Sequence, residues 1–187
     1  SEPLHFIFDT GAAANLMTDR TAEALNIKAS GRQTVQGASG STTIKRTNGQ
    51  SVTIQGVTFR KANFLVMNLD HLSDVDTPLD GIVGALILNH FVVEMDYDSS
   101  EIKLYPGKGF KAPAGWNKET FSLRSFGIPI VSNTVTLPSG QKITGSYLVD
   151  TGAATTVKFN TPFVNEHQLI DKLGNHYSYT SRALSNE

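Results

Sequence analysis

The strongest constraint in this 187-residue sequence is a short internal repeat. Asp-Thr-Gly-Ala-Ala occurs at residues 9–13 and again at residues 150–154, and three apolar residues precede each copy. At average amino-acid usage, one Asp-Thr-Gly is expected in roughly 4% of chains of this length and two in about one in a thousand. A single copy is explained by a strand that ends in an Asx-type turn. The matched pair indicates two related turns with a shared role.

Each copy of the repeat places an aspartate at the end of an expected buried strand. The apolar runs before Asp9 and Asp150 predict these strands, and Gly11 and Gly152 allow the sharp turn and close backbone approach that follow. We therefore expect the two carboxyl groups to face each other. Two carboxylates about 3 Å apart cannot both ionise, so such a pair shares one proton and its two pKa values split. One member can then activate water while the other donates a proton.

Composition narrows the classes of function. Hydrophobic residues make up 39% of the chain and charged residues 18%, which is typical of a folded globular protein and not of a disordered one. The net charge of −1 and the lack of a Lys/Arg cluster argue against nucleic acid as a partner. No apolar run approaches the length of a membrane span, so no membrane contact is expected. The chain has no cysteine, which excludes disulfides and a thiol nucleophile.

The rest of the pattern predicts a mainly β protein with a few short helices. A helix is expected over residues 18–25, with Thr18 as its N-cap and with Leu25 and Ile27 packing inward. A second short helix is expected over residues 85–90 and a third over residues 162–169.

The expected strands pair as hairpins. Asn48-Gly49 separates the β-branched segments 42–47 and 51–54, which predicts a hairpin turn there, and a further strand is expected over Val57–Val66. Two more hairpins are expected later in the chain, with their strands at residues 91–96 and 101–105 and at residues 128–137 and 143–150.

Two further segments extend the pattern of the repeat. Asp80-Gly81-Ile82-Val83-Gly84 is an apolar stretch punctuated by glycine, and the expected hairpin of residues 91–105 follows it. Together with the two Asp-Thr-Gly-Ala turns, these segments resemble the aspartic protease superfamily of pepsin-like and retropepsin-like enzymes, and are most similar to bacterial retropepsin-like aspartyl proteases. The resemblance covers residues 4–105 well and residues 128–158 moderately.

The resemblance implies a mainly β, two-lobed, acid-protease-like β-barrel fold with an internal pseudo-twofold axis. It divides the chain into an N-terminal lobe (1–106), a linker (107–117) and a C-terminal lobe (118–187) that we expect to be partial. After Asp150 only 37 residues remain, and they contain no second apolar-apolar-Gly segment. We therefore expect a further C-terminal segment or domain outside this sequence, and we leave open whether the given chain cleaves peptides by itself.

The resemblance also assigns roles to individual residues. It implies an aspartic-type endopeptidase that acts on peptide or protein substrates without a cofactor or metal. Exported proteins are common among the relatives, which favours a periplasmic or secreted location. The implied catalytic residues are Asp9 and Asp150, the residues supporting their loops are Thr10, Gly11, Thr151 and Gly152, and the candidate substrate-covering flap has Gly37, Ala38, Ser39 and Gly40 at its tip.

Alanine follows each Asp-Thr-Gly turn, at positions 12 and 153. A serine or threonine there could donate a hydrogen bond that lowers the pKa of the aspartate, whereas alanine cannot. We therefore expect an activity that is shifted less towards acid pH than that of a pepsin.

Three other readings compete with peptide hydrolysis. The five histidines lack the spacing of metal ligands, and residues 96–101 have the wrong length and no glycine for a calcium loop. A serine hydrolase would need a Gly-x-Ser-x-Gly elbow, which residues 37–41 do not form. The serious alternative is a catalytically silent peptide-binding protein with the same fold, although both Asp-Thr-Gly turns are intact.

Overall fold

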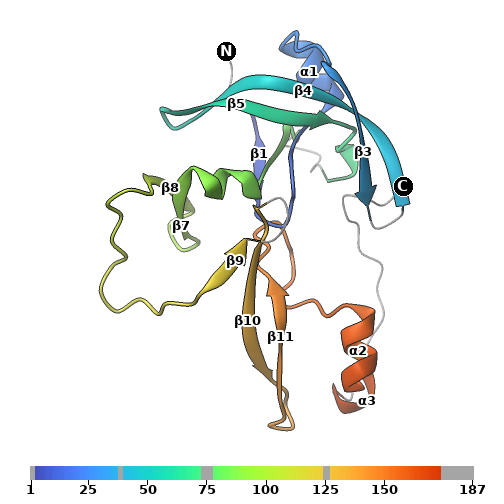
Figure 1. Cartoon of the computed structure of the whole chain (residues 1–187), viewed down its shortest axis with the longest axis vertical. Coiled ribbons are helices and arrows are strands. Elements are labelled where there is room, and N and C mark those ends of the chain that lie inside the picture. The colour runs from blue at the N-terminus through green and yellow to red at the C-terminus, as the bar shows by residue number, and fades with distance from the viewer. Residues whose placement is uncertain (1–2, 38–39, 73–77, 124–126, 174–187) are drawn as a thin grey trace.

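The computed structural model describes residues 3–37, 40–72, 78–123 and 127–173. The described strands form three β-sheets, and the two larger ones are the centres of an N-terminal and a C-terminal lobe (Figure 1). The N-terminal sheet has six strands and curls into half a barrel, and the C-terminal sheet has three strands. The mainly β fold class predicted from the sequence is confirmed.

The N-terminal lobe holds most of the regular structure. In chain order its elements are β1 (Phe6–Asp9), β2 (Asn15–Met17), α1 (Asp19–Ala24), β3 (Gly31–Gly37), β4 (Gly40–Ile54), β5 (Val57–Val66), η1 (Asp70–Leu72), β6 (Gly81–Gly84), η2 (Ala85–Asn89), β7 (Phe91–Asp96) and β8 (Glu101–Pro106).

The six-stranded sheet has the order β1-β6-β2-β5-β4-β3. Strand β6 lies between β1, which it pairs with in parallel, and β2, which it pairs with antiparallel. Apolar side chains of β2, β5 and β6 form the centre of the lobe, where Leu16, Leu65 and Ile82 belong to one buried cluster. Because β1 is joined to this core through β6, the end of β1 is held rigidly, and Asp9 is its last residue.

Helix α1 begins where the sequence predicts it. The Thr18 hydroxyl accepts a hydrogen bond from the N–H of Thr21 at 3.0 Å, which satisfies one of the free donors at the helix start. Ile27 packs against the buried cluster that includes Ala22, as predicted. The prediction for Leu25 is wrong, because its side chain is 42% exposed at the helix end.

The predicted hairpin turn at Asn48-Gly49 is also wrong. Strand β4 runs through both residues, and the pairing with β5 shifts register between Thr47 and Gln50. Gly49 has a φ of +73°, so its left-handed conformation is used in a bulge and not in a turn. The turn lies at Gln55-Gly56, where φ is +47° and +83°, the pair of positive values that a two-residue type I′ turn needs.

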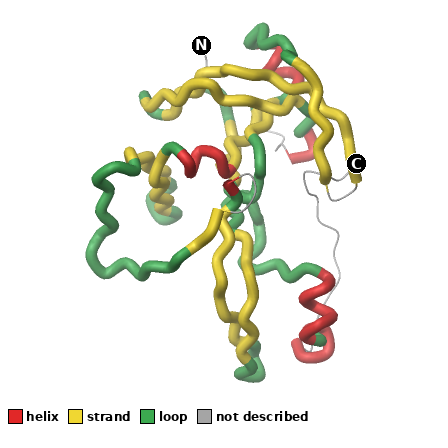
Figure 2. The backbone as a smooth tube through the Cα atoms, viewed as in Figure 1, coloured by secondary structure: helices red, strands yellow, loops and turns green. Residues whose placement is uncertain are grey.

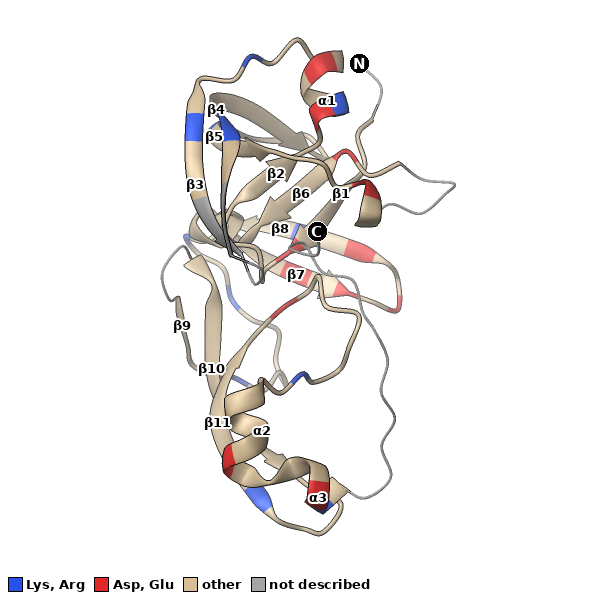
Figure 3. Ribbon diagram, turned by 90° about the vertical axis from the view of Figure 1, so that its right-hand side faces the viewer, with Lys and Arg blue, Asp and Glu red and all other residues tan. Residues whose placement is uncertain are grey.

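Strands β7 and β8 form the predicted hairpin, which pairs Phe91 with Pro106 and Asp96 with Glu101. At the turn, the Asp96 carboxylate accepts the N–H groups of Asp98 and Ser99, and this acidic end is visible in Figure 3. A long loop without regular structure then leads to the second lobe (Figure 2).

The C-terminal lobe consists of β9 (Phe121–Leu123), β10 (Pro129–Thr136), β11 (Lys142–Leu148), α2 (Thr161–His167) and α3 (Leu169–Leu173). Its sheet has the order β11-β10-β9, so β11 is an edge strand. Leu137, Ile143 and Leu169 form a small core between the sheet and the helices. None of the helices in the described residues is long and apolar enough to span a membrane.

The predicted β10–β11 hairpin and the third predicted helix are both present, the helix as two pieces. Asn160 caps α2, and Gln168 adopts a left-handed conformation with φ of +52° that separates α2 from α3. Strand β9 was not predicted, because three exposed residues are too few to show a strand pattern in the sequence.

Candidate active site

The two Asp-Thr-Gly turns meet where the lobes join. Asp9 ends β1, and Asp150 lies two residues beyond the end of β11. In each turn the aspartate carboxylate accepts the N–H of the glycine two residues later, at 2.8 Å for Gly11 and 2.9 Å for Gly152. The two copies of the repeat therefore have the same local structure as well as the same sequence.

The two threonines bind each turn to the other. The Thr10 hydroxyl donates to the carbonyl of Val149 at 2.6 Å, and the Thr151 hydroxyl donates to the carbonyl of Phe8 at 2.8 Å. Each hydroxyl also accepts the N–H of the other threonine, at 3.1 Å in both directions. These four reciprocal bonds span more than 130 residues of sequence and relate the turns by an approximate twofold axis.

The glycines allow the carboxyl groups to approach. A Cβ atom on Gly11 would lie 2.6 Å from Cγ of Asp150, and a Cβ atom on Gly152 would lie 2.6 Å from Cγ of Asp9. Real Cβ atoms do not come so close to other heavy atoms, so any side chain at either glycine would displace the opposite carboxyl group. Each aspartate thus packs on the backbone of the opposite turn.

The two carboxyl groups differ in their exposure to water. Asp9 is 8% exposed, whereas Asp150 is an exposed residue. Burial raises the pKa of Asp9 to about 6, helped by the charge of Asp150 and a hydrogen bond with its side chain. The N–H groups of Gly11 and Ala12 act in the opposite direction but do not overcome burial. At mildly acid pH the pair can therefore retain one proton.

The first turn has a dense support behind it. Gly84, at the end of β6, donates its N–H to the side chain of Asn15 at 3.0 Å, and Ala85 donates to the carbonyl of Ala12 at 2.9 Å. A Cβ atom on Gly84 would lie 2.5 Å from the carbonyl oxygen of Ala14, so the crossing of β6 behind the turn requires glycine.

Sequence reasoning missed the roles of Asn15 and Asp80. Asp80 is buried and accepts hydrogen bonds from the N–H of His5, the hydroxyl of Thr21 and the guanidinium of Arg20 at 2.8–2.9 Å. Burial alone would raise the pKa of Asp80, but these partners together hold it below its usual range. The only sign of a role for Asp80 in the sequence was its position directly before the apolar segment Gly81–Gly84.

The second turn lacks an equivalent support among the described residues. The residues after Asp150 form a loop that leads to α2, and no described strand crosses behind them. Instead, a groove of about 640 Å³ opens beside Asp150. The groove is lined by Asn133 and Val135 of β10, by residues 146–150 at the end of β11, by Ala153 and residues 155–160, and by Phe163 of α2.

The predicted flap falls on the hairpin of β3 and β4. Gly37 and Gly40 pair with each other at its end. Ala38 and Ser39, the predicted tip, lie outside the described residues.

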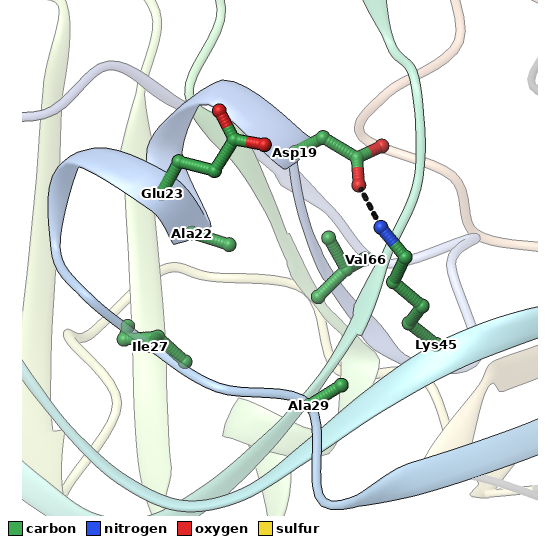
Figure 4. A pocket seen from close by; sticks show the side chains of 7 residues that line it. All are labelled: Asp19, Ala22, Glu23, Ile27, Ala29, Lys45 and Val66. Carbon is green, nitrogen blue, oxygen red and sulfur yellow. Dashed lines mark hydrogen bonds and ion pairs between the residues drawn. The ribbon is translucent and has the colours of Figure 1, made fainter.

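A second pocket, of about 200 Å³, lies beside α1, and neither Asp9 nor Asp150 lines it (Figure 4). Its floor is apolar, and Asp19 and Lys45 form an ion pair of 2.8 Å at its rim. Within the described residues, no three acidic or histidine side chains are grouped so that they could hold a metal ion.

Residues 1–86 match the family described as "Aspartyl protease". The matched span contains the Asp9 turn and the β6 strand that supports it, but it ends well before Asp150. No curated protein matches the chain.

Proposed function

Because residues 1–86 belong to the aspartyl protease family, we propose that this protein is a peptidase in which Asp9 and Asp150 together activate water. The observation that carries the proposal is the packing of each carboxyl group against the glycine of the opposite turn. This packing brings two carboxyl groups from distant parts of the chain close together, which supports the proposal because hydrolysis by an aspartate pair needs two carboxyl groups that share a proton.

The difference in burial suggests which member starts with the proton. Asp9, with its raised pKa, donates a proton to the carbonyl oxygen of the peptide bond, and Asp150 takes one from the attacking water. The water oxygen bonds to the carbonyl carbon and gives a tetrahedral intermediate. The proton on Asp150 then passes to the amine nitrogen, the C–N bond breaks, and Asp9 regains its proton as the carbonyl re-forms.

The substrate is proposed to be an extended segment of peptide or protein. An extended peptide offers its scissile carbonyl to the pair while its backbone stays free to form hydrogen bonds along the site. The β3–β4 hairpin, in which Gly37 pairs with Gly40, is the proposed cover over the bound peptide.

A catalytically silent peptide-binding protein is the second candidate. The observation in its favour is the exposure of Asp150, since no strand among the described residues supports its turn as β6 supports that of Asp9. A carboxylate that is open to bulk water is a weaker partner for a shared proton than a buried one, because desolvation strengthens the coupling between charges.

A cleavage assay separates the two candidates. Wild type, Asp9→Asn and Asp150→Asn are incubated with a peptide library, with Asp171→Asn in α3 as a control for loss of an exposed carboxylate far from the turns. Loss of general acid or base catalysis should slow cleavage by about 10²- to 10⁴-fold in the first two variants and leave the control unchanged. A statine-type mimic of the transition state should inhibit the wild type.

Full activity in either turn variant would overturn the proposed pair. Binding of peptides by the wild type without any cleavage would favour the silent candidate. Circular dichroism of all three variants checks that each remains folded.

A further inference from the structure

Asn15 lies where three strands of the first lobe meet. It begins β2, directly after the loop that contains the Asp9 turn, and its side chain is buried. Strand β2 pairs with β5 along its whole length, whereas its pairing with β6 ends at Leu16 opposite Ile82. The backbone of β2 therefore does not pair with Gly84, the last residue of β6, and the Asn15 side chain bonds there instead.

Both ends of the Asn15 amide are used. Its oxygen accepts the N–H of Gly84 at 3.0 Å, and its nitrogen donates to the carbonyl of Asn63 at 3.2 Å. The first partner can only donate and the second can only accept, so together they fix the orientation of the amide. An apolar side chain at this position would leave the buried N–H of Gly84 without a partner, which folded proteins rarely tolerate.

Gly84 in turn packs against the loop that carries the carboxyl group of the first turn. A Cβ atom on Gly84 would lie 2.5 Å from the carbonyl oxygen of Ala14 and 2.6 Å from that of Ala12. The next residue of the chain donates its N–H to the same Ala12 carbonyl at 2.9 Å. The N–H of Ala12 donates to the Asp9 carboxylate at 3.0 Å. A continuous series of contacts therefore leads from the Asn15 amide to this carboxyl group.

We propose that Asn15 is a positioning residue for the reaction, whose side chain holds β6 against the back of the first turn and so fixes the buried Asp9 carboxyl group opposite Asp150. The inference rests on the proposed function, since a catalytic pair must keep its geometry to within about 0.5 Å. Neither bond of Asn15 involves the carboxyl pair, so its effect passes through Gly84. The second turn carries Thr156 at the same distance from its aspartate, and that residue is exposed.

The burial of Asp9 connects this contact with a measurable property. Burial is the main reason why the pKa of Asp9 is raised to about 6, and Asp150 is the ionisable group that acts on it. The other groups of β6 and of the opposite turn that contact the first turn carry no charge. If β6 moves away from the turn, water reaches Asp9 and its pKa falls towards the ordinary value of an aspartate.

The test compares Asn15→Leu with the matched control Thr21→Val. Leucine has the branched shape of asparagine and forms neither bond. The Thr21 hydroxyl is buried and bonds with Thr18 and Asp80, so its loss also removes buried hydrogen bonds from the first lobe, but none that involves the Asp9 turn. The carboxyl carbon resonance of Asp9, assigned with Asp9→Asn, is followed through a pH titration in each protein.

The titration of Asp9 should separate the two variants. In Asn15→Leu its pKa should fall by about one pH unit or more, because the turn is no longer held away from water. In Thr21→Val it should stay at the wild-type value of about 6. An unchanged titration in folded Asn15→Leu would overturn the inference. An equal fall in Thr21→Val would overturn it as well, because any loosening of the lobe would then move Asp9.

Cleavage gives a second readout. A displacement of about 1 Å at a catalytic group can reduce the rate about 10²-fold, so kcat per folded molecule of Asn15→Leu should fall by about ten- to a hundredfold. KM should stay within about twofold of the wild type, because a positioning residue acts on the transition state and not on substrate binding. Thr21→Val should keep the wild-type kcat. A variant Asn15→Leu that is less stable but keeps its kcat and pH profile would have lost only a structural contact, which contradicts the inference.

Asn15→Asp tests the hydrogen bonds themselves and serves if the leucine variant does not fold. A protonated carboxyl group can accept the N–H of Gly84 and donate to the carbonyl of Asn63, as the amide does, whereas a carboxylate can only accept. Burial keeps this group protonated in mild acid. The variant should therefore reach within about threefold of the wild-type kcat at pH 4 and be at least about tenfold slower at pH 6. The same ratio at both pH values would contradict the assignment.

The outcomes separate this inference from the proposed function. The titration of Asp9 needs no substrate, so it decides the role of Asn15 whether or not a peptide is cut. Cleavage by the wild type with an unmoved titration in Asn15→Leu would leave the peptidase standing and remove the role of Asn15. Absence of cleavage by the wild type with every peptide, together with a moved titration, would count against the proposed function and still support the placement of Asp9 by Asn15.

Discussion

The two Asp-Thr-Gly turns have the same sequence and share the hydrogen bond from glycine to aspartate, but they have different surroundings. Asp9 ends β1, an edge strand of the six-stranded sheet, with β6 paired beside it and Gly84 packed behind its turn. Asp150 follows β11, which is also an edge strand, but no described strand packs behind its turn, and a groove opens beside it. The local structure of the turn is therefore set by its own residues, whereas the burial of the carboxyl group is set by what the rest of the chain packs around it.

The comparison also shows what joins the two halves. The threonine bonds and the reciprocal packing of aspartate on glycine are symmetric, although the lobes around them are not. The contact between the turns is thus independent of how complete each lobe is. The following predictions test where this symmetry holds and where it fails, in order of decreasing effect.

The largest effect is expected from filling the space at the glycines. Gly11→Ala places a methyl group against Asp150, and Gly152→Ala places one against Asp9, so each should push the carboxyl groups apart. A displacement of about 1 Å at a catalytic group can reduce the rate about 10²-fold, and we expect losses of that order in kcat for both variants.

Gly107→Ala is the control, because a methyl group there meets nothing within 4 Å. If the turns are equivalent, the two active-site variants lose similar activity. A much smaller loss in Gly11→Ala would mean that the exposed Asp150 moves aside more easily than Asp9.

The next effect concerns pH and belongs to Asp9. Its pKa is about 6 in the folded protein, compared with about 3.9 in an unfolded chain, so the folded state binds the proton more tightly. The resulting stabilisation is fully present below pH 4 and is lost as the pH rises through 6, and it amounts to about 3 kcal/mol. Urea unfolding of wild type and Asp9→Asn at pH 4 and pH 7.5 measures it.

From pH 4 to pH 7.5, the free energy of unfolding of the wild type should fall relative to that of Asp9→Asn. An equal difference at both values would show that the pKa of Asp9 is not raised. Because the pair needs its shared proton, cleavage by the wild type should also fall as the pH rises above about 6.

The third effect tests the threonine contacts. Thr10→Val and Thr151→Val each remove a hydroxyl that donates to one carbonyl and accepts one N–H of the opposite turn. Leaving such groups unpaired should reduce the free energy of unfolding by about 1–2 kcal/mol. Thr10 is buried and Thr151 is partly exposed, so Thr10→Val should be the more destabilising of the two. Equal losses would show that water does not replace the lost bonds at Thr151.

The smallest effect is expected at the support of the first lobe. Arg20 is 59% exposed and forms an ion pair of 2.9 Å with the buried Asp80. Arg20→Gln should cost about 0.5 kcal/mol at pH 7, as expected for a largely exposed partner. The pKa of Asp80 is lowered, so its stabilisation is present at neutral pH and is lost as the pH falls below its folded value. The difference between wild type and Arg20→Gln should therefore vanish in strong acid, and a constant difference would contradict this.

The sequence predicted correctly those features that depend on residues adjacent in the chain. The repeated turns, the Thr18 cap and the β7–β8 hairpin are specified by a few adjacent side chains, and all three are present as expected. The catalytic role of the turns stays a prediction. The resemblance also pointed to Thr10 and Thr151 as supports of the two turns, and no local pattern contains the contact between them.

Long-range packing accounts for what the sequence did not reveal. Asn48-Gly49 has the composition of a hairpin turn, but the pairing of β4 with β5 continues through it and places the turn at Gln55-Gly56. Asn15 and Asp80 gain their importance from partners such as Gly84 and His5, about 70 residues away, so no local pattern marks them. The difference in burial between Asp9 and Asp150 likewise depends on β6, which packs only behind the Asp9 turn in the described chain, and not on the turns themselves.

The reciprocal threonine contact has a consequence for how the chain is connected. Each half presents the same few atoms to the other, as two subunits of a symmetric dimer do, so the contact is an isologous interface within one polypeptide. The long loop between β8 and β9 then acts mainly as a tether that raises the effective concentration of one half near the other. On this view, the covalent link determines how often the two halves meet, whereas the threonines determine how they are aligned when they do.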